Sequence, residues 1–135
     1  MEDGNAGIER HKTVRTDRAP SPAGHYSQAT VANGFVFISG QLPVTVDGTP
    51  RADTGFEDQA RLALGNMLAI LDAAGGNPAQ LTRVTAYIAG VENWPRFNAV
   101  YAEMLGDCRP ARTVVPVVEL HHGCLVEIDA IGVVK

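Results

Sequence analysis

The chain has 135 residues, of which 45% are hydrophobic, and a formal net charge of −4 at pH 7. The length fits one domain of ordinary size, and the hydrophobic fraction is typical of a globular protein rather than a disordered chain. The charge is spread along the sequence without a concentrated basic face, which argues against a nucleic acid or an anionic membrane as the main partner.

The first 18 residues are polar and aperiodic, and we expect them to form a flexible segment ahead of a single domain over residues 19–135. They lack the basic and apolar regions of a secretory signal, and no apolar run in the chain is long enough to span a bilayer. A cytoplasmic location is therefore expected. Cys108 and Cys124 have no CxxC spacing, and in the reducing cytosol both are expected to remain thiols.

The first regular elements are two β-prone runs, residues 26–32 and 35–40, joined by Asn33-Gly34. Asn-Gly between such runs predicts a hairpin, because a type I′ turn needs positive φ at both positions. Thr54 and Glu57 then have the spacing of a capping box, which predicts a helix start. The helix buries one face and ends at Gly75-Gly76. Its apolar positions are Phe56, Ala60, Leu64, Met67, Leu68 and Leu71.

The second half of the chain predicts three strands and one helix. Residues 82–89 alternate between apolar and polar side chains, which indicates a strand with one wet or interfacial face. Asn93 is positioned to cap a second helix, with Pro95 in its first turn. Its apolar face contains Trp94, Phe97, Val100, Tyr101, Met104 and Leu105. Residues 112–119 and 125–134 predict a final hairpin. The order β-β-α-β-α-β-β predicts an α+β fold with both helices on one face of a mixed sheet.

Two carboxylates on the last strand are the first candidates for chemistry. Glu127 and Asp129 alternate with apolar residues, so they project from one face roughly 7 Å apart. A solvated face explains this spacing, and so does a carboxylate pair of the kind used in glycoside hydrolysis. Little else in the sequence resembles a sugar-binding cleft.

Arg112 and Ser39-Gly40-Gln41 are the other candidates. Arg112 precedes an apolar strand, where it is either a rim residue or an anion clamp that holds a carboxylate through two parallel hydrogen bonds. Gly40 would let a ligand approach the backbone, although an ordinary strand end also fits. No GxSxG motif surrounds Ser39, so it is not expected to be a nucleophile. His121 and His122 are adjacent and no metal motif is present, so no metal site is expected.

Six segments occur in order over nearly the whole folded part of the chain: APSPAGHYSQA from residue 19, ISGQLPV from 38, QARLALGN from 59, FNAVY from 97, RPAR from 109 and VEIDAI from 126. Together they resemble the RidA/YjgF family of reactive-intermediate deaminases. The resemblance implies a chorismate-mutase-like α+β fold and a homotrimer with clefts between neighbouring subunits. It also implies hydrolysis of 2-aminoacrylate-type enamines and imines to a 2-oxo acid and ammonia, without a cofactor.

The resemblance also implies roles for particular residues. Arg112 matches the arginine that holds the carboxylate of the small-molecule substrate, and Glu127 matches the glutamate that positions the attacking water. The positions that match residues lining the cleft are Tyr26, Ser39, Gly40 and Asn98.

Three positions depart from the family pattern. Val114 stands where many deaminases of the family have cysteine, and His25 and His121 replace prolines. These departures leave two alternatives open. One is an enzyme of the same fold that acts on a specialised pathway enamine, and the other is a non-catalytic trimeric module that binds a carboxylate ligand.

Overall fold

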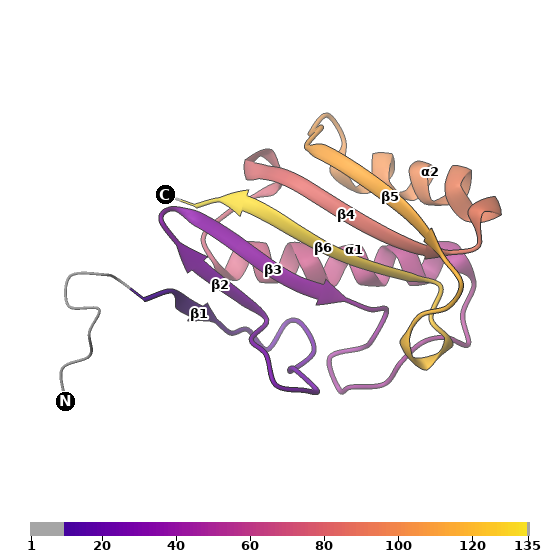
Figure 1. The fold of residues 1–135 in the computed structure, drawn as a ribbon, viewed down its shortest axis with the longest axis horizontal. Coiled ribbons are helices and arrows are strands. Elements are labelled where there is room, and N and C mark those ends of the chain that lie inside the picture. Colours follow the sequence, from indigo (N-terminus) through magenta and orange to yellow (C-terminus); the bar gives the residue numbers. More distant parts are fainter. Residues whose placement is uncertain (1–9, 135) are drawn as a thin grey trace.

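A computed structural model describes residues 10–134, which form a mixed sheet with two helices packed on one of its faces (Figure 1). The α+β class and the placement of the helices are therefore confirmed. The elements are β1 (Lys12–Val14), β2 (Ala29–Ala32), β3 (Phe35–Gln41), α1 (Phe56–Ala73), η1 (Pro78–Gln80), β4 (Leu81–Ala89), η2 (Val91–Asn93), α2 (Trp94–Leu105), β5 (Ala111–Val117), η3 (His121–Gly123) and β6 (Val126–Val133).

The sheet order is β1-β2-β3-β6-β4-β5, so the predicted final hairpin is wrong. Strand β5 runs parallel to β4, with α2 as the crossover between them. Strand β6 instead lies between β3 and β4 and runs antiparallel to both. Strand β5 occupies one edge of β4. After residues 118–125, β6 therefore pairs with the other edge of β4 and with β3.

The predicted flexible N-terminal segment is also partly wrong. Lys12–Val14 forms strand β1, which pairs antiparallel with β2 through Lys12↔Val31 and Val14↔Ala29. A three-residue edge strand with polar side chains suits a solvated sheet edge, and it is too short to show a period in the sequence. Residues 1–9 lie outside the described residues.

The first hairpin turn is confirmed, because Asn33 and Gly34 adopt φ of 52° and 79° as the predicted turn requires.

The helix starts differ from their predictions. Helix α1 has Gly55 as its N-cap, and the Thr54 hydroxyl donates instead to a carbonyl in the preceding turn. Asn93 does not cap α2 with its side chain, because its Oδ1 accepts a hydrogen bond from Arg96 at 2.9 Å while its amide donates to the carbonyl of Ala89 at the end of β4. Neither polar side chain caps a backbone amide of its helix.

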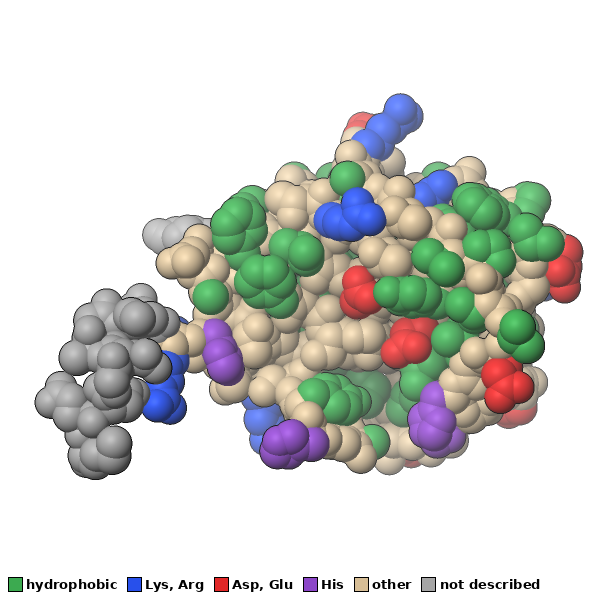
Figure 2. All heavy atoms as spheres, viewed as in Figure 1, with side chains coloured by type: hydrophobic (Ala, Val, Ile, Leu, Met, Phe, Trp, Pro, Cys, Tyr) green, Lys and Arg blue, Asp and Glu red, His purple; other side chains and the backbone are tan. Residues whose placement is uncertain are grey.

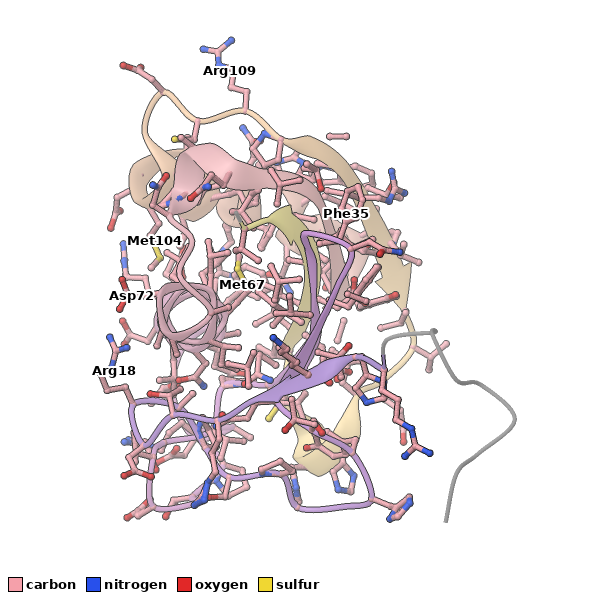
Figure 3. The ribbon with its side chains drawn as sticks, turned by 90° about the vertical axis from the view of Figure 1, so that its left-hand side faces the viewer. Arg18, Phe35, Met67, Asp72, Met104 and Arg109 are labelled. Atoms are coloured by element: carbon pink, nitrogen blue, oxygen red, sulfur yellow. The ribbon has the colours of Figure 1, made fainter. Side chains whose placement is uncertain are left out.

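The core lies between the helices and one face of the sheet. The predicted apolar face of α1 is buried, with Leu68 half-buried, whereas Trp94 of α2 is 38% exposed. Figure 3 shows Met67 pointing from α1 toward the sheet and Phe35 lying away from the helices. On the opposite sheet face, which we call the open face, Phe35, Phe37 and Val133 are exposed. Figure 2 shows this face, with hydrophobic side chains on both sides of central acidic side chains.

Candidate active site

Glu127 lies on the open face of β6, and a bulge in β3 brings Gly40 against it. The register passes from Ile38↔Ala130 to Gln41↔Ile128, so Ser39 and Gly40 together oppose a single residue of β6. A Cβ atom at Gly40 would overlap Oε2 of Glu127 and lie 3.2 Å from its Cδ. The carboxylate thus packs directly on the backbone of Gly40, which explains the glycine at this position.

A hollow of about 310 Å³ opens beside this carboxylate. It brings together four of the predicted site residues, and sequence reasoning did not assign Leu42 to it. Its lining residues are Tyr26, Ser39, Gly40, Leu42, His121 and Glu127. The hydroxyl of Ser39 donates to the carbonyl of Ser27 at 2.6 Å, so it holds the preceding loop against β3 rather than acting as an activated nucleophile.

The surroundings of Glu127 favour its protonated form. Burial and the neighbouring Asp129 carboxylate raise the pKa of Glu127 above its usual value, and His121 opposes this rise. Asp129 accepts a 3.2 Å hydrogen bond from the hydroxyl of Tyr87. A carboxyl group with a raised pKa exchanges protons more readily near neutral pH, which suits it to general acid–base work.

Arg112 occupies a second hollow, of about 340 Å³, beside α2. Its Nη1 donates to Oδ1 of Asn98 at 3.0 Å, and its guanidinium carbon lies 4.9 Å from the ring centroid of Tyr101. Within residues 10–134, Asn98 is the one hydrogen-bond partner of this guanidinium, which leaves donors available for an anion. The hydroxyl of Tyr101 is buried without a hydrogen-bond partner among the same residues. This geometry favours the anion-clamp interpretation over the rim interpretation.

One chain does not bring these two hollows together. Arg112 of β5 pairs with Val84 of β4, which in turn pairs with Ala130 of β6. Val84 and Ala130 are buried on the helix side of the sheet, so Arg112 projects from that side as well. Glu127 lies two strands from Arg112, three positions before Ala130, and projects from the open face. The strand dimensions place the two Cα atoms about 14 Å apart, with their side chains on opposite faces. The described residues of a single chain therefore do not bring Arg112 and Glu127 into one hollow.

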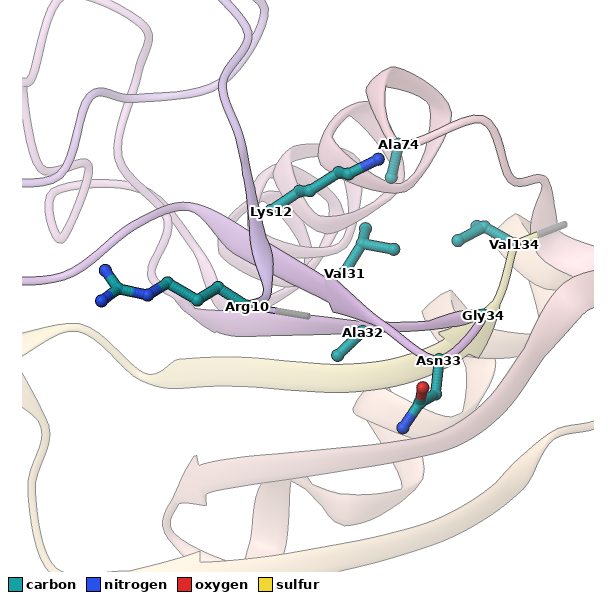
Figure 4. Close-up of a pocket in the computed structure, with 8 residues that line it drawn as sticks. All are labelled: Arg10, Lys12, Val31, Ala32, Asn33, Gly34, Ala74 and Val134. Atoms are coloured by element: carbon teal, nitrogen blue, oxygen red, sulfur yellow. The ribbon is translucent and has the colours of Figure 1, made fainter. Parts of the chain in front are cut away.

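A third hollow, of about 380 Å³, contains none of the predicted site residues. Figure 4 shows Lys12 extending toward Ala74, while Arg10 points away from it. A lysine near the C-terminal end of α1 complements the negative end of the helix dipole. This hollow therefore lies at the C-terminal end of α1 rather than beside Glu127 or Arg112.

Within residues 10–134, no group of three or more His, Cys, Asp or Glu side chains is arranged to hold a metal ion. No helix in this part of the chain has the length and apolarity needed to cross a membrane.

The comparisons with known proteins agree with the fold. The family model described as Endoribonuclease L-PSP matches residues 16–134. A RutC family protein of Pyrococcus horikoshii is 39% identical over 121 residues, which cover 90% of this chain and 96% of that protein. A 2-iminobutanoate/2-iminopropanoate deaminase of Dermatophagoides farinae is 32% identical over 124 residues, which cover 92% and 97%. The crystal structure of RidA from an Antarctic Psychrobacter species superposes with a TM-score of 0.86 at 34% identity, covering 91% of this chain and 99% of that one.

The fold and the matched relatives define a small α+β protein of the L-PSP type. The chain belongs to this family, which is the RidA/YjgF family expected from the sequence.

Proposed function

We propose that the chain is a deaminase that hydrolyses reactive 2-imino and 2-enamino acids to 2-oxo acids and ammonia. The observation that carries the proposal is the Glu127 carboxylate, packed on Gly40 beside a hollow and with a raised pKa. Family membership and the deaminase name of one relative support the same reaction.

The chemistry requires positioning and proton transfer at an electrophilic carbon. Arg112 holds the substrate carboxylate through two parallel hydrogen bonds, which fixes the imine carbon in place. Starting from the iminium form of the substrate, water adds to this carbon as Glu127 accepts one of its protons, and a neutral carbinolamine forms. Glu127 returns that proton to the nitrogen, and the carbon–nitrogen bond breaks as the carbinolamine hydroxyl gives its proton to Glu127, which leaves the 2-oxo acid and ammonia. Ammonia then takes the proton from Glu127 and departs as ammonium, so the proton balance closes without a cofactor.

The proposal includes a homotrimer in which each site takes residues from two chains. Arg112 and Glu127 lie on opposite faces of one chain, so a second copy must supply one of them. The exposed Phe35, Phe37 and Val133 make the open face apolar, as expected of a surface that another copy covers.

The activity test compares Arg112→Ala and Arg112→Lys with the wild type. An amino-acid oxidase generates the imino acid in the assay, and release of the 2-oxo acid is followed. We expect Arg112→Ala to lose at least about 100-fold in kcat/KM, because a bidentate anchor is removed. Arg112→Lys, which keeps the charge but not the planar fork, should retain an intermediate rate. An unchanged rate for Arg112→Ala would refute the proposed function.

Subunit mixing tests the shared site. Chains with Arg112→Ala and chains with Glu127→Gln are expressed together and purified through two different tags. If each site combines Arg112 of one chain with Glu127 of another, every mixed trimer that carries both tags has one intact site of three, so about one third of the wild-type sites are restored. Each variant alone is the control. Activity no higher than that of the single variants would contradict a site shared between chains.

A second candidate keeps the fold but assigns a larger pathway enamine as substrate. A further hollow of about 130 Å³ adjoins the Glu127 hollow and shares Tyr26, Gly40, Leu42 and His121 with it, which provides room for a longer side chain. Turnover of a larger enamine, with none for small imino acids, would favour this candidate. Tight carboxylate binding without turnover of either would instead favour a binding module. We do not propose RNA cleavage, because the net charge is −4 and affinity for RNA depends on phosphate neutralisation.

A further inference from the structure

His121 lies at the edge of the Glu127 hollow, in the 3-10 turn that precedes β6. It lines both the hollow of about 310 Å³ and the adjoining one of about 130 Å³. The turn is held by backbone hydrogen bonds from Gly123 to Leu120 and from Cys124 to His121, each 3.1 Å long. The imidazole is therefore attached to a fixed turn.

The neighbouring histidine, His122, provides a matched control. His122 adopts a φ of 61°, which folds the chain back so that the two ring centroids are 3.7 Å apart. Only His121 lines the hollow that contains Glu127. The two imidazoles thus share one turn but differ in their access to the carboxylate.

The groups around Glu127 leave His121 in a distinctive position. On β6 the Asp129 carboxylate repels the charge of Glu127, and on β4 Tyr87 contributes a neutral hydroxyl. The buried thiol of Cys124, at the end of the turn, is uncharged. Among residues 10–134, His121 is the one group that lowers the pKa of Glu127 through its charge.

We propose that His121 is a positioning residue for Glu127: across the hollow that both residues line, its imidazolium offsets part of the effect of burial and favours the ionised carboxylate, so that the base stays active in mildly acidic solution. The effect on the rate rests on the proposed function. The charge interaction itself rests on the hollow that His121 and Glu127 both line. In the proposed trimer, Arg112 of a second copy would also face Glu127, but its charge is constant over this pH range, whereas that of an imidazole changes.

The kinetic test compares the pH profiles of kcat/KM for the wild type, His121→Gln, His121→Lys and His122→Gln. Loss of the cationic partner raises the pKa of Glu127 further, so the acid limb for His121→Gln should move up by about 0.5 to 1 pH unit. This shift corresponds to a loss of about 3- to 10-fold on that limb. On the alkaline side of this limb the profiles should converge, because Glu127 is then fully ionised in both proteins.

The other variants distinguish charge from structure. His121→Lys keeps a positive charge and should leave the acid limb at or below its wild-type position. His122→Gln should follow the wild type. A His121→Gln profile that superimposes on the wild type would overturn the proposal. A loss that is equal at every pH would do the same, because it would indicate a purely structural role.

Nuclear magnetic resonance measures the interaction without any substrate. Glutamate labelled with ¹³C at the side-chain carboxyl is incorporated, and Glu127→Gln identifies the Glu127 signal. The titration midpoint of Glu127 should be higher in His121→Gln than in the wild type. An unchanged midpoint overturns the proposal whatever the activity. If the midpoint moves but the wild type hydrolyses no imino acid, the proposed function fails and the charge interaction stands.

Discussion

Replacing Gly40 with alanine should move the Glu127 carboxylate while the fold remains intact. The added Cβ would overlap Oε2 of Glu127 and lie 3.2 Å from Cδ and 3.4 Å from Cγ. Gly40 is not among the glycines with positive φ, so the backbone accepts alanine there. The atoms in conflict belong to the end of a flexible side chain, which can retreat.

The expected effect on the reaction is much larger than the effect on folding. To restore ordinary contact, the carboxylate must retreat by about 1 Å, and a displacement of this size costs about 100-fold in rate. That loss corresponds to about 2.7 kcal/mol of transition-state stabilisation. The free energy of unfolding should change by less than about 1 kcal/mol, because alanine also reduces the entropy of the unfolded chain.

The assay combines kcat/KM for an imino acid with thermal unfolding, and Gly65→Ala is the matched control. Gly65 lies inside α1, and a Cβ there would meet no atom within 4 Å. The control should therefore keep full activity and gain about 1 kcal/mol of stability from its higher helix propensity. If Gly40→Ala keeps the wild-type kcat/KM, the position of the Glu127 carboxylate does not govern the reaction, and its assigned role is wrong.

Three further substitutions test the supports of the site and of the fold. Asn98→Ala removes the 3.0 Å hydrogen bond that orients Arg112, so KM should rise about 5-fold in steady-state kinetics, and an unchanged KM would contradict that orienting role. Gln59→Ala removes the Oε1 atom that accepts a 2.8 Å hydrogen bond from the Leu125 amide and leaves this amide without a partner, so urea unfolding should show a loss of about 2 to 4 kcal/mol rather than a neutral change. Arg96 on α2 lowers the pKa of Glu57 from 4.5 to about 2. The Glu57–Arg96 pair therefore stabilises the fold fully above pH 4.5 and progressively less as pH falls toward 2. In thermal melts across that window, Glu57→Gln should depend less on pH than the wild type, and parallel curves would count against the pair.

Local patterns predicted the helices and the first hairpin because their signals lie within a few residues. The spacing of apolar residues in α1 and the Asn33-Gly34 turn need no knowledge of distant neighbours. The pairing of β6 is different, because it depends on which sheet edge remains open after β4 and β5 have paired. Two β-prone runs with a glycine-containing turn between them fit a hairpin equally well, so the sequence could not distinguish the two arrangements.

The helix caps illustrate a second limit of local reasoning. Glu57 has the spacing of a capping box, yet its carboxylate accepts hydrogen bonds from Arg96 at 2.7 and 2.9 Å. The Thr54 hydroxyl and the Asn93 amide donate to backbone carbonyls ahead of their helices instead of capping them. A tertiary ion pair and a tight loop compete for the same side chains, and neither can be recognised from spacing alone.

The composition of the candidate site depended on the resemblance more than on patterns. Alternation along β6 correctly placed Glu127 and Asp129 on one face, because apolar neighbours mark the other face. The approach of Gly40 depends on a bulge in β3, and a bulge has no periodic signal. Leu42 follows that bulge, so no alternation indicated that it would line the same hollow.

The opposite orientation of Arg112 and Glu127 had no readable signal either. Residues 113–118 are almost wholly apolar, so their pattern does not say which face of the sheet Arg112 shares. The pairing of Arg112 with Val84 settles this point, since Val84 is buried beneath the helices. Under the proposed function, the two halves of the site meet only when a second copy brings its Arg112 to the Glu127 of the first. In the proposed trimer, the contacts that bury the apolar open face are therefore the same contacts that assemble the chemistry.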